Sequence, residues 1–518
     1  MKPQVLPVEE AFDSAREKFE EIVEQLCSPA ALELAHGELE TLINIEGMEL
    51  LRRLFQGHLD FRGTGDVGES FKSTDGVVRS HRRLGSRGLM SVFGEVNITR
   101  MRYGIRGTTG LVPLDAELNL PVELYSHGVR MRVAEEVAKT SYDETVDSVS
   151  KTTGASVPKR QVEELSVRAS ADFEAFYQAR EVVSSEEEST SDLLVISVDG
   201  KGIVMRTEDL REQTRKKALG QSHKLSKRLS RGEKRNAKRM ATVAAVYDID
   251  PFIRQPADIV AELRPVGQMV KRPRAENKRV WASVERPPEV VIAEAFAEAE
   301  RRDPQHNKQW VGLVDGNKTQ LRLLKEQAAR SGVVLTIVLD LIHVLGYLWK
   351  AAFVFHKEGS EQAQSWVTER LVRLLHGNSS HVAAGIRRSA TLRNLSSEQR
   401  VPADKCADYL LKYAEFLRYD QYLKAGLPIA TGVIEGACRH LIKDRMDLTG
   451  ARWSLVGAES VLRLRSLRSS GDFEEYWRFH IEQEMERNHA VHYVGPIPLM
   501  HEIDGKKSDR STELRLVA

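Results

Sequence analysis

Residues 193–200 read LLVISVDG, a short and almost wholly apolar run that ends in an aspartate and a glycine. Continuous apolar runs of this length are typical of strands that are buried on both faces of a sheet. Such a strand delivers the residue that follows it to the edge of the sheet, so we expect Asp199 at an edge. The run predicts that a domain with a buried sheet begins here.

Candidate strands and helices follow one another after this run. We expect strands at residues 241–247, 279–284, 310–314 and 333–339, and helices at residues 290–302 and 319–330. The order of three strands, helix, strand, helix, strand predicts a mixed sheet with helices packed on it. This is the order of the ribonuclease H-like fold, so we expect a multidomain α+β protein with a core of that class.

Two further acids stand in contexts that resemble that of Asp199. Asp315 follows the strand in QWVGLVDGNKTQ, and Glu435 lies on a helix in GLPIATGVIEGACRHLIKDR beside an apolar stripe. Taken singly, an Asp-Gly pair is a common turn and a lone helical glutamate is usually solvated. The conjunction of the three favours a metal site, because Mg²⁺ prefers oxygen ligands and two such ions about 4 Å apart support phosphoryl transfer.

Length and composition set the frame for this site. A chain of 518 residues with 41% apolar and 29% charged residues predicts two to four domains and no membrane span. The N-terminus lacks the features of a signal peptide, and three widely separated cysteines fit a reducing cytoplasm rather than a disulfide framework. Net charge is only +1, so the total balance gives no indication of nucleic acid.

The chain divides at changes in composition and periodicity. The expected parts are a helical region (1–60), a linker with a β-hairpin around the Gly94-Glu95 step (61–120), a helix-turn-helix region (121–180), an acidic linker (181–192), the first part of the catalytic core (193–355), a helical insertion (356–424), the second part of the core (425–475) and a C-terminal tail (476–518).

Residues 141–170 have helix-turn-helix spacing. A helix is expected at 141–152 and another at 157–170, with Gly154 in the turn between them. The second helix would present Lys159, Arg160 and Gln161 at its N-terminal end, where such helices contact base edges. A plain helical hairpin with a solvated face is the alternative.

A basic segment follows the first predicted catalytic strand. Between Arg211 and Arg239, twelve Lys or Arg residues stand against two acids. Clusters of this kind suit phosphate contacts that do not depend on sequence, and a solvated insertion is the alternative. The clustered residues are Lys216, Lys217, Lys227, Arg228, Lys234, Arg235, Lys238 and Arg239.

The blocks SVDGKG, LVDGN, LDLIHVLGYLWKAA and GVIEGACRHLIKDRMDLTGARWS resemble those of bacterial insertion-sequence transposases of the ISKra type. These enzymes belong to the Asp-Asp-Glu class and are similar to mutator-type transposases, which carry a helical domain between the second Asp and the Glu. The resemblance implies that Asp199, Asp315 and Glu435 hold two Mg²⁺ ions, for which Mn²⁺ can substitute. It also implies a cytoplasmic, nucleoid-associated protein.

The related enzymes share a motif of Cys or Asp followed after two residues by His, which Asp340 and His343 match. His343 would lie near the metal-bound phosphate, whereas the alternative is that Asp340 caps a helix and His343 packs. After Glu435 we expect either DNA-backbone contacts or solvated rim charges from Arg439, Lys443, Arg445 and Arg452.

The expected function is a DNA transposase that hydrolyses a phosphodiester at the element end and joins the freed 3′-hydroxyl to target DNA. Its partners would be double-stranded DNA, namely terminal inverted repeats and target, and further copies of the chain in a homodimer or higher oligomer. Two alternatives stay open: a ribonuclease H-like nuclease without strand transfer, and a non-catalytic DNA-binding regulator.

Overall fold

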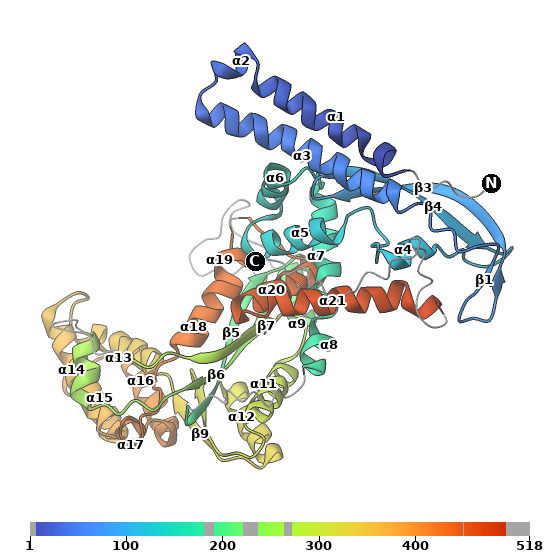
Figure 1. Cartoon of the computed structure of the whole chain (residues 1–518). Helices are drawn as coiled ribbons and strands as arrows, with labels where there is room; N and C mark the ends of the chain where they lie inside the picture. The colour runs from blue at the N-terminus through green and yellow to red at the C-terminus, as the bar shows by residue number, and fades with distance from the viewer. Residues whose placement is uncertain (1–6, 181–190, 221–236, 264–271, 449, 494–518) are drawn as a thin grey trace. The chain divides into compact units, whose positions relative to one another are not determined.

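The computed structural model describes residues 7–180, 191–220, 237–263, 272–448 and 450–493, which form two compact units. One unit comprises Met1–Asp172 with Glu474–Ala518, and the other comprises Phe173–Phe473 (Figure 1). The structure is a mixture of helices and strands, as expected. Among the described residues, no helix is both long and apolar enough to cross a bilayer.

The first unit begins with a pair of long helices. α1 (Val8–Leu26) and α3 (His36–Phe61) pack side by side, with the short α2 (Pro29–Leu32) between them in sequence. Two short strands, β1 (Phe71–Lys72) and β2 (Val78–Arg79), then pair with each other. The expected helical region at the N-terminus is therefore present.

The expected β-hairpin consists of β3 (His81–Ser91) and β4 (Gly94–Gly104). Its turn falls at Val92 and Phe93, just before the Gly94-Glu95 step that the sequence indicated. The reason lies in Gly94, which has a φ of +123° and closes the turn in a conformation that L side chains rarely adopt. α4 (Pro113–Glu117) follows the hairpin.

The helices with helix-turn-helix spacing pack on a third one. α6 (Tyr142–Thr152) and α7 (Lys159–Ala169) both contact α5 (His127–Lys139). Gly154 in the turn donates its N–H to Val92 O at 2.8 Å, and a Cβ there would lie 2.4 Å from Phe93 O. The glycine thus permits the hairpin turn to approach the helical turn, a role that the sequence did not indicate.

The segment 476–518, which the sequence set apart as a tail, starts inside a helix. α21 (Phe473–Asn488) belongs to the first unit along most of its length, and its Glu484 forms an ion pair with the fully buried Arg130. His480 and Arg487 on the same helix bond Asp172 at 2.7 Å and 2.6 Å. Buried charges of this kind are stable only when paired, so α21 is an integral part of its unit.

The second unit is built on a five-stranded sheet with the order β7-β6-β5-β8-β9. Its strands are β5 (Leu193–Val204), β6 (Lys238–Ile249), β7 (Glu276–Ser283), β8 (Gln309–Val314) and β9 (Leu335–Leu339). β5, β6 and β7 pair antiparallel, whereas β8 and β9 run parallel to β5. All five expected strands are therefore present in one mixed sheet.

Helices cover both faces of this sheet. Arg279 and Trp281 of β7 reach Glu298 and Glu294 of α11 (Pro288–Arg302), which packs beside α12 (Lys318–Ser331). Val280 and Ala282 alternate with them and point to the opposite face. The helices α18 (Gly432–Ala437) and α20 (Leu455–Ser470) also contact this sheet. Residues 243–247 are buried without interruption, which explains their continuous apolar sequence.

Helical segments fill the interval between β9 and α18. α13 (Leu341–Phe355) follows β9, and the next helices pack on it and on one another. They are α14 (Glu361–Leu375), α15 (Ser379–Leu392), α16 (Val401–Lys412) and α17 (Tyr419–Lys424). The remaining helices of this unit are α8 (Phe173–Ala179), α9 (Glu212–Leu219), α10 (Pro256–Leu263) and α19 (Asp444–Met446).

Candidate active site

Three aspartates stand at or just beyond the paired ends of three neighbouring parallel strands: Asp199 lies on β5, whereas Asp315 and Asp340 directly follow β8 and β9. The last pairs are Ser197 with Leu313 between β5 and β8, and Val314 with Leu339 between β8 and β9. Extending these registers places Asp315 beside both Asp199 and Asp340. Because adjacent strands are about 4.8 Å apart, the middle position of Asp315 brings all three acids to one edge region of the sheet.

Asp199 does not end its strand, contrary to the expectation from the sequence. β5 continues to Val204 because β6 pairs with it along the whole length, with Asp199 opposite Val243. The parallel partner β8, by contrast, pairs only as far as Ser197. Asp199 therefore lies where β5 no longer pairs with β8, and its side chain is half-buried.

A buried thiol that the sequence analysis did not single out contacts Asp199. Cys438 Sγ donates a hydrogen bond to Asp199 Oδ2 at 3.2 Å. Burial, followed by the negative charge of Asp199, raises the pKa of the Cys438 thiol well above its usual range, so the thiol stays protonated and can donate. Its position one helical turn after Glu435 was the only available signal.

The loop that carries Asp315 is held by the helical segment. Tyr409 Oη of α16 donates to Asp315 O at 2.9 Å, and Tyr413 Oη donates to Gly316 O at 2.7 Å. Gly316 has a φ of +93°, and a Cβ there would lie 3.0 Å from Tyr409 Oη. The glycine is thus required for this close approach, and the tyrosines fix the backbone next to the carboxylate.

Asp340 caps α13 and also binds the start of the helix that carries Glu435. Its buried carboxylate accepts hydrogen bonds from the N–H groups of Ile342 at 3.2 Å, His343 at 3.1 Å and Thr431 at 3.1 Å. Thr431 directly precedes α18. Asp340 therefore caps α13, as one of the two alternatives expected. It also holds the start of the helix that carries Glu435.

Glu435 lies on α18 with an exposed side chain. The expected apolar stripe beside it is buried, as Ile434, Cys438, Leu441 and Ile442 show. Partial burial, and then the charges of Asp340 and Asp199, raise the pKa of Glu435. A π-helical turn over Cys438–Lys443 follows immediately, and such turns are frequent at functional sites.

His343 and Glu435 line one cavity of about 230 Å³ together with Asp340, Ile342, Gly346, Tyr347 and Lys350. The His343 ring lies edge-on to Tyr347, with ring centroids 5.5 Å apart. His343 is half-buried and lines the same cavity as Glu435. Its ring therefore packs against Tyr347 and is also accessible to a group bound in the cavity.

The donor chemistry at this edge fits magnesium. Asp199, Asp315 and Glu435 offer carboxylate oxygens, which Mg²⁺ prefers. Burial and then repulsion from Asp340 and Asp199 raise the pKa of Glu435, and a cation relieves that repulsion. Across the residues that the structure describes, however, no group of three or more His, Cys, Asp or Glu side chains is arranged so that it could hold a metal ion. The ligand types are suitable, but they do not form a closed coordination set.

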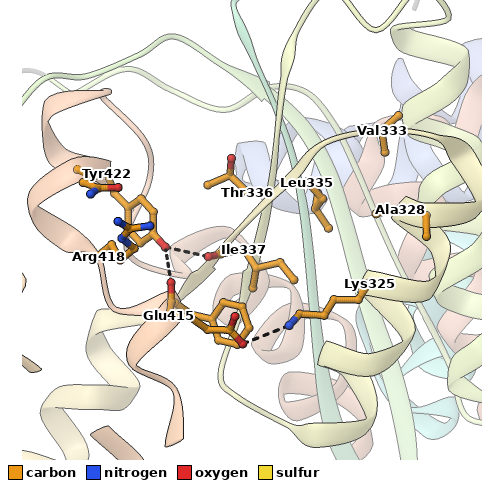
Figure 2. A pocket seen from close by; sticks show the side chains of 12 residues that line it. Lys325, Ala328, Val333, Leu335, Thr336, Ile337, Glu415, Arg418 and Tyr422 are labelled. Carbon is orange, nitrogen blue, oxygen red and sulfur yellow. Dashed lines mark hydrogen bonds and ion pairs between the residues drawn. The ribbon is translucent and has the colours of Figure 1, made fainter. Parts of the chain in front are cut away.

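A larger cavity of about 490 Å³ lies at the other end of β9 and does not include these acids. Figure 2 shows Tyr422 reaching Ile337 O on the free edge of β9, and Lys325 paired with Glu415 at 3.2 Å. Tyr419 Oη similarly donates to Leu339 O at 2.9 Å. The hydroxyl groups of Tyr419 and Tyr422 thus form hydrogen bonds with carbonyl groups of the edge strand β9, which protects this edge against pairing with another strand.

The residues of the expected recognition helix lie on the surface of the first unit. Lys159 and Arg160 are exposed at the start of α7, and Gln161 is half-buried. Lys159 pairs with Asp143 at 2.7 Å, whereas Arg160 and Gln161 both contact Glu164 at 3.1 Å. Exposed pairs of this kind contribute little to stability, so these side chains can exchange partners.

The basic segment is only partly described. Lys216, Lys217 and Lys238 are exposed, while Lys227, Arg228, Lys234 and Arg235 lie outside the described residues. Arg239 differs from the expectation, because its guanidinium donates to the backbone oxygens of Val284 at 2.8 Å and Asp209 at 3.1 Å. Arg239 therefore joins three chain segments and is not a surface contact.

The basic residues after Glu435 also divide into two groups. Arg439, Lys443 and Arg452 are exposed, as a DNA-facing surface requires. Arg445 is buried, with its guanidinium 4.8 Å from the ring centroid of Trp453. Burial of Arg445 on α19 fits neither of the two expectations, a contact with the DNA backbone or a solvated charge at the rim.

No family model matches this sequence, and no curated protein matches it either. Among solved structures, the chain is similar to the Drosophila P element transposase strand transfer complex, at 10% sequence identity and a TM-score of 0.23. The match covers 70% of this chain and 81% of that chain. A TM-score of this size does not establish a common fold.

Proposed function

We propose that the chain is a DNA transposase of the ISKra type, which cuts and joins DNA strands at one metal-dependent site. The observation that supports this most directly is that Asp199 and Asp315 each stand two residues beyond the last pair of β5 and β8, with Glu435 close enough for Asp199 to contribute to its raised pKa. The same site would release a 3′-hydroxyl at the element end and then join it to target DNA.

The topology supports this proposal. Three antiparallel strands followed by two parallel ones, in the order β7-β6-β5-β8-β9, is the arrangement expected for a ribonuclease H-like core. The helical segment between β9 and α18 stands where mutator-type enzymes have their insertion. In this proposal the segment would position Asp315, because its residues Tyr409 and Tyr413 hold the loop of Asp315 through hydrogen bonds.

In this proposal Asp199, Asp315 and Glu435 would hold two Mg²⁺ ions. When bound, the ions activate the attacking oxygen and stabilise the leaving one. The exposed Glu435 side chain can rotate toward the aspartates, whereas Cys438 orients Asp199 and Asp340 fixes the start of α18. Asp340 is thus a positioning residue, and His343 would hydrogen-bond the phosphate.

The DNA contacts are proposed on the exposed basic side chains. Lys159, Arg160 and Gln161 would recognise the element ends, and the basic segment would contact phosphates in any sequence. On the active-site side, Arg439, Lys443 and Arg452 would contact the backbone of the strand being cut.

Incubation of the full chain with supercoiled DNA that carries element ends, in the presence of Mg²⁺, tests this function. Joined products support a transposase. Cleavage without joined products would instead identify a nuclease, and binding without cleavage would identify a regulator; either result overturns the proposal.

A further inference from the structure

Three tyrosine rings in contact lead from the segment between β9 and α18 to the cavity that Glu435 lines. Tyr409 meets Tyr413 edge to face, at a centroid distance of 4.9 Å and an interplanar angle of 64°, and stacks on Tyr347 of α13, at 4.2 Å and 16°. Tyr347 lines the cavity of about 230 Å³, whereas Tyr409 does not. The Tyr347 ring therefore borders the cavity, where a further flat ring can contact it.

The face of α13 beside this ring is open. Ile342, Gly346 and Lys350 follow one another at helical spacing along the cavity. A Cβ added at Gly346 would meet nothing within 4 Å, so no packing inside the chain requires a glycine there. Glycine is unfavourable inside a helix, and at this position it leaves the backbone open to the close approach of a ligand in the cavity.

A cation stands next to the ring. Lys350 Nζ lies 5.5 Å from the Tyr347 ring centroid and, within the described part of the chain, forms no ion pair. An aromatic face beside a free ammonium group suits a base with its adjoining phosphate. The cavity volume is below the usual range of about 300–1,000 Å³ for ligand pockets, which suits one base and excludes a stacked duplex.

We propose that this cavity is a subsite for one unpaired nucleobase next to the phosphate that is cut. The base stacks on Tyr347, Lys350 contacts the adjoining phosphate and Gly346 leaves room for the sugar. The inference rests on the proposed function, because Asp340 and Glu435 line the same cavity. It adds a base-binding residue, Tyr347, and a reason for the glycine in α13.

The test uses the full chain without Mg²⁺ and a duplex oligonucleotide that has 2-aminopurine as an unpaired base at its 3′ end. Anisotropy of a fluorescein label on the same duplex reports binding, and quenching of 2-aminopurine reports stacking. We expect quenching with wild type and with Tyr347→Phe. Tyr347→Ala should lose the quenching and bind roughly 5- to 100-fold more weakly, as expected for one stacked base.

Gly346→Ala gives a second test that does not depend on removing a packed ring. Its methyl group would occupy the ligand side of α13, so we expect weaker binding at an unchanged or higher melting temperature. Gly385→Ala in α15 is the matched control, because its Cβ also meets nothing within 4 Å. It should leave binding unchanged.

The outcomes separate the two claims. Binding without quenching, or equal affinity of Gly346→Ala and Gly385→Ala, would overturn the subsite while leaving the proposed function standing. An unchanged anisotropy with wild-type protein would overturn both the subsite and the DNA-binding function.

Discussion

Cys438 donates its thiol hydrogen to Asp199 Oδ2 at 3.2 Å, across 239 residues of sequence. The bond joins the helical segment of Glu435 to the strand of the first acid. A protonated thiol next to a carboxylate fixes the carboxylate orientation without adding a charge. The distance between Asp199 and the Glu435 helix is thereby defined before any ligand binds.

We expect Cys438→Ala to slow Mg²⁺-dependent cleavage about 10-fold, equal to about 1.4 kcal/mol, and to increase the Mg²⁺ concentration required. Cys438→Ser retains a donor and should restore most of the activity. Cys406→Ala removes another buried cysteine and should lower only the melting temperature. A Mg²⁺ titration in which Cys438→Ala behaves as wild type would remove Cys438 from the site.

Glu435→Gln should increase the stability of the metal-free protein at neutral pH. The pKa of Glu435 is raised in the folded state, which means that the ionised carboxylate destabilises the folded protein at neutral pH. As the pH falls through this raised pKa, the folded state takes up the proton before the unfolded state does, and wild type gains stability. The difference between the two proteins should therefore vanish at acidic pH.

Urea unfolding of both proteins across this pH range measures the effect. Mg²⁺ should stabilise wild type more than Glu435→Gln, by about 2.7 kcal/mol if the ion is present at 100 times its Kd and the variant does not bind it. A Gln variant that is less stable than wild type at neutral pH would contradict the raised pKa of Glu435, and with it the burial and the repulsion that cause it.

His343→Ala should slow cleavage about a hundredfold if the imidazole assists the reaction at the phosphate. A purely packing role would instead lower the melting temperature and leave the rate nearly normal. His440→Ala, an exposed histidine on the π-helical turn, is the control and should cut normally. Single-turnover rates beside thermal unfolding curves distinguish the two cases.

Alanine at Lys159, Arg160 and Gln161 together should weaken binding to element ends by 10-fold or more, since each good base contact contributes about 1–3 kcal/mol. Binding to unrelated DNA should change less. Arg132→Ala, which removes an exposed arginine from α5, is the control. Equal affinity and equal sequence preference in a gel shift would place recognition elsewhere, for example in the β3–β4 hairpin.

The basic segment should behave differently in the same assay. Substitution by glutamine should weaken binding to every DNA sequence and flatten its salt dependence by roughly 0.9 in the log-log slope for each lost phosphate contact. An unchanged slope would show that the segment does not contact the backbone. The residues to replace are Lys216, Lys217, Lys227, Arg228, Lys234, Arg235 and Lys238.

Much of the sheet could be predicted because long stretches of β5, β6 and β8 are buried on both faces and so appear as apolar runs in the sequence. The continuation of β5 beyond Asp199 could not, since it depends on pairing with β6 rather than on a local pattern. The place of α21 could not be predicted either, and the sequence indicates only a tail there. Glu484 of α21 pairs with Arg130, which lies far away in the sequence.

The site shows the same limit. Apolar runs predicted that Asp199 and Asp315 follow strands, and helical spacing predicted the apolar stripe beside Glu435. The hydrogen bonds that orient Asp199 and the start of α18 join residues far apart in the chain. The sequence predicts Arg445 on the surface because it is one of four basic residues that follow Glu435. Its place on the apolar side of the helical segment buries it instead.

The most direct test of the account is Mg²⁺-dependent cleavage of supercoiled DNA by Asp199→Ala, Asp315→Ala and Glu435→Ala beside wild type. Each variant should lose about a hundredfold or more in rate while still binding DNA. Glu415→Ala, an acid at the larger cavity, should cut as wild type does. Wild-type cutting by any of the three would contradict the assignment of that acid to the site.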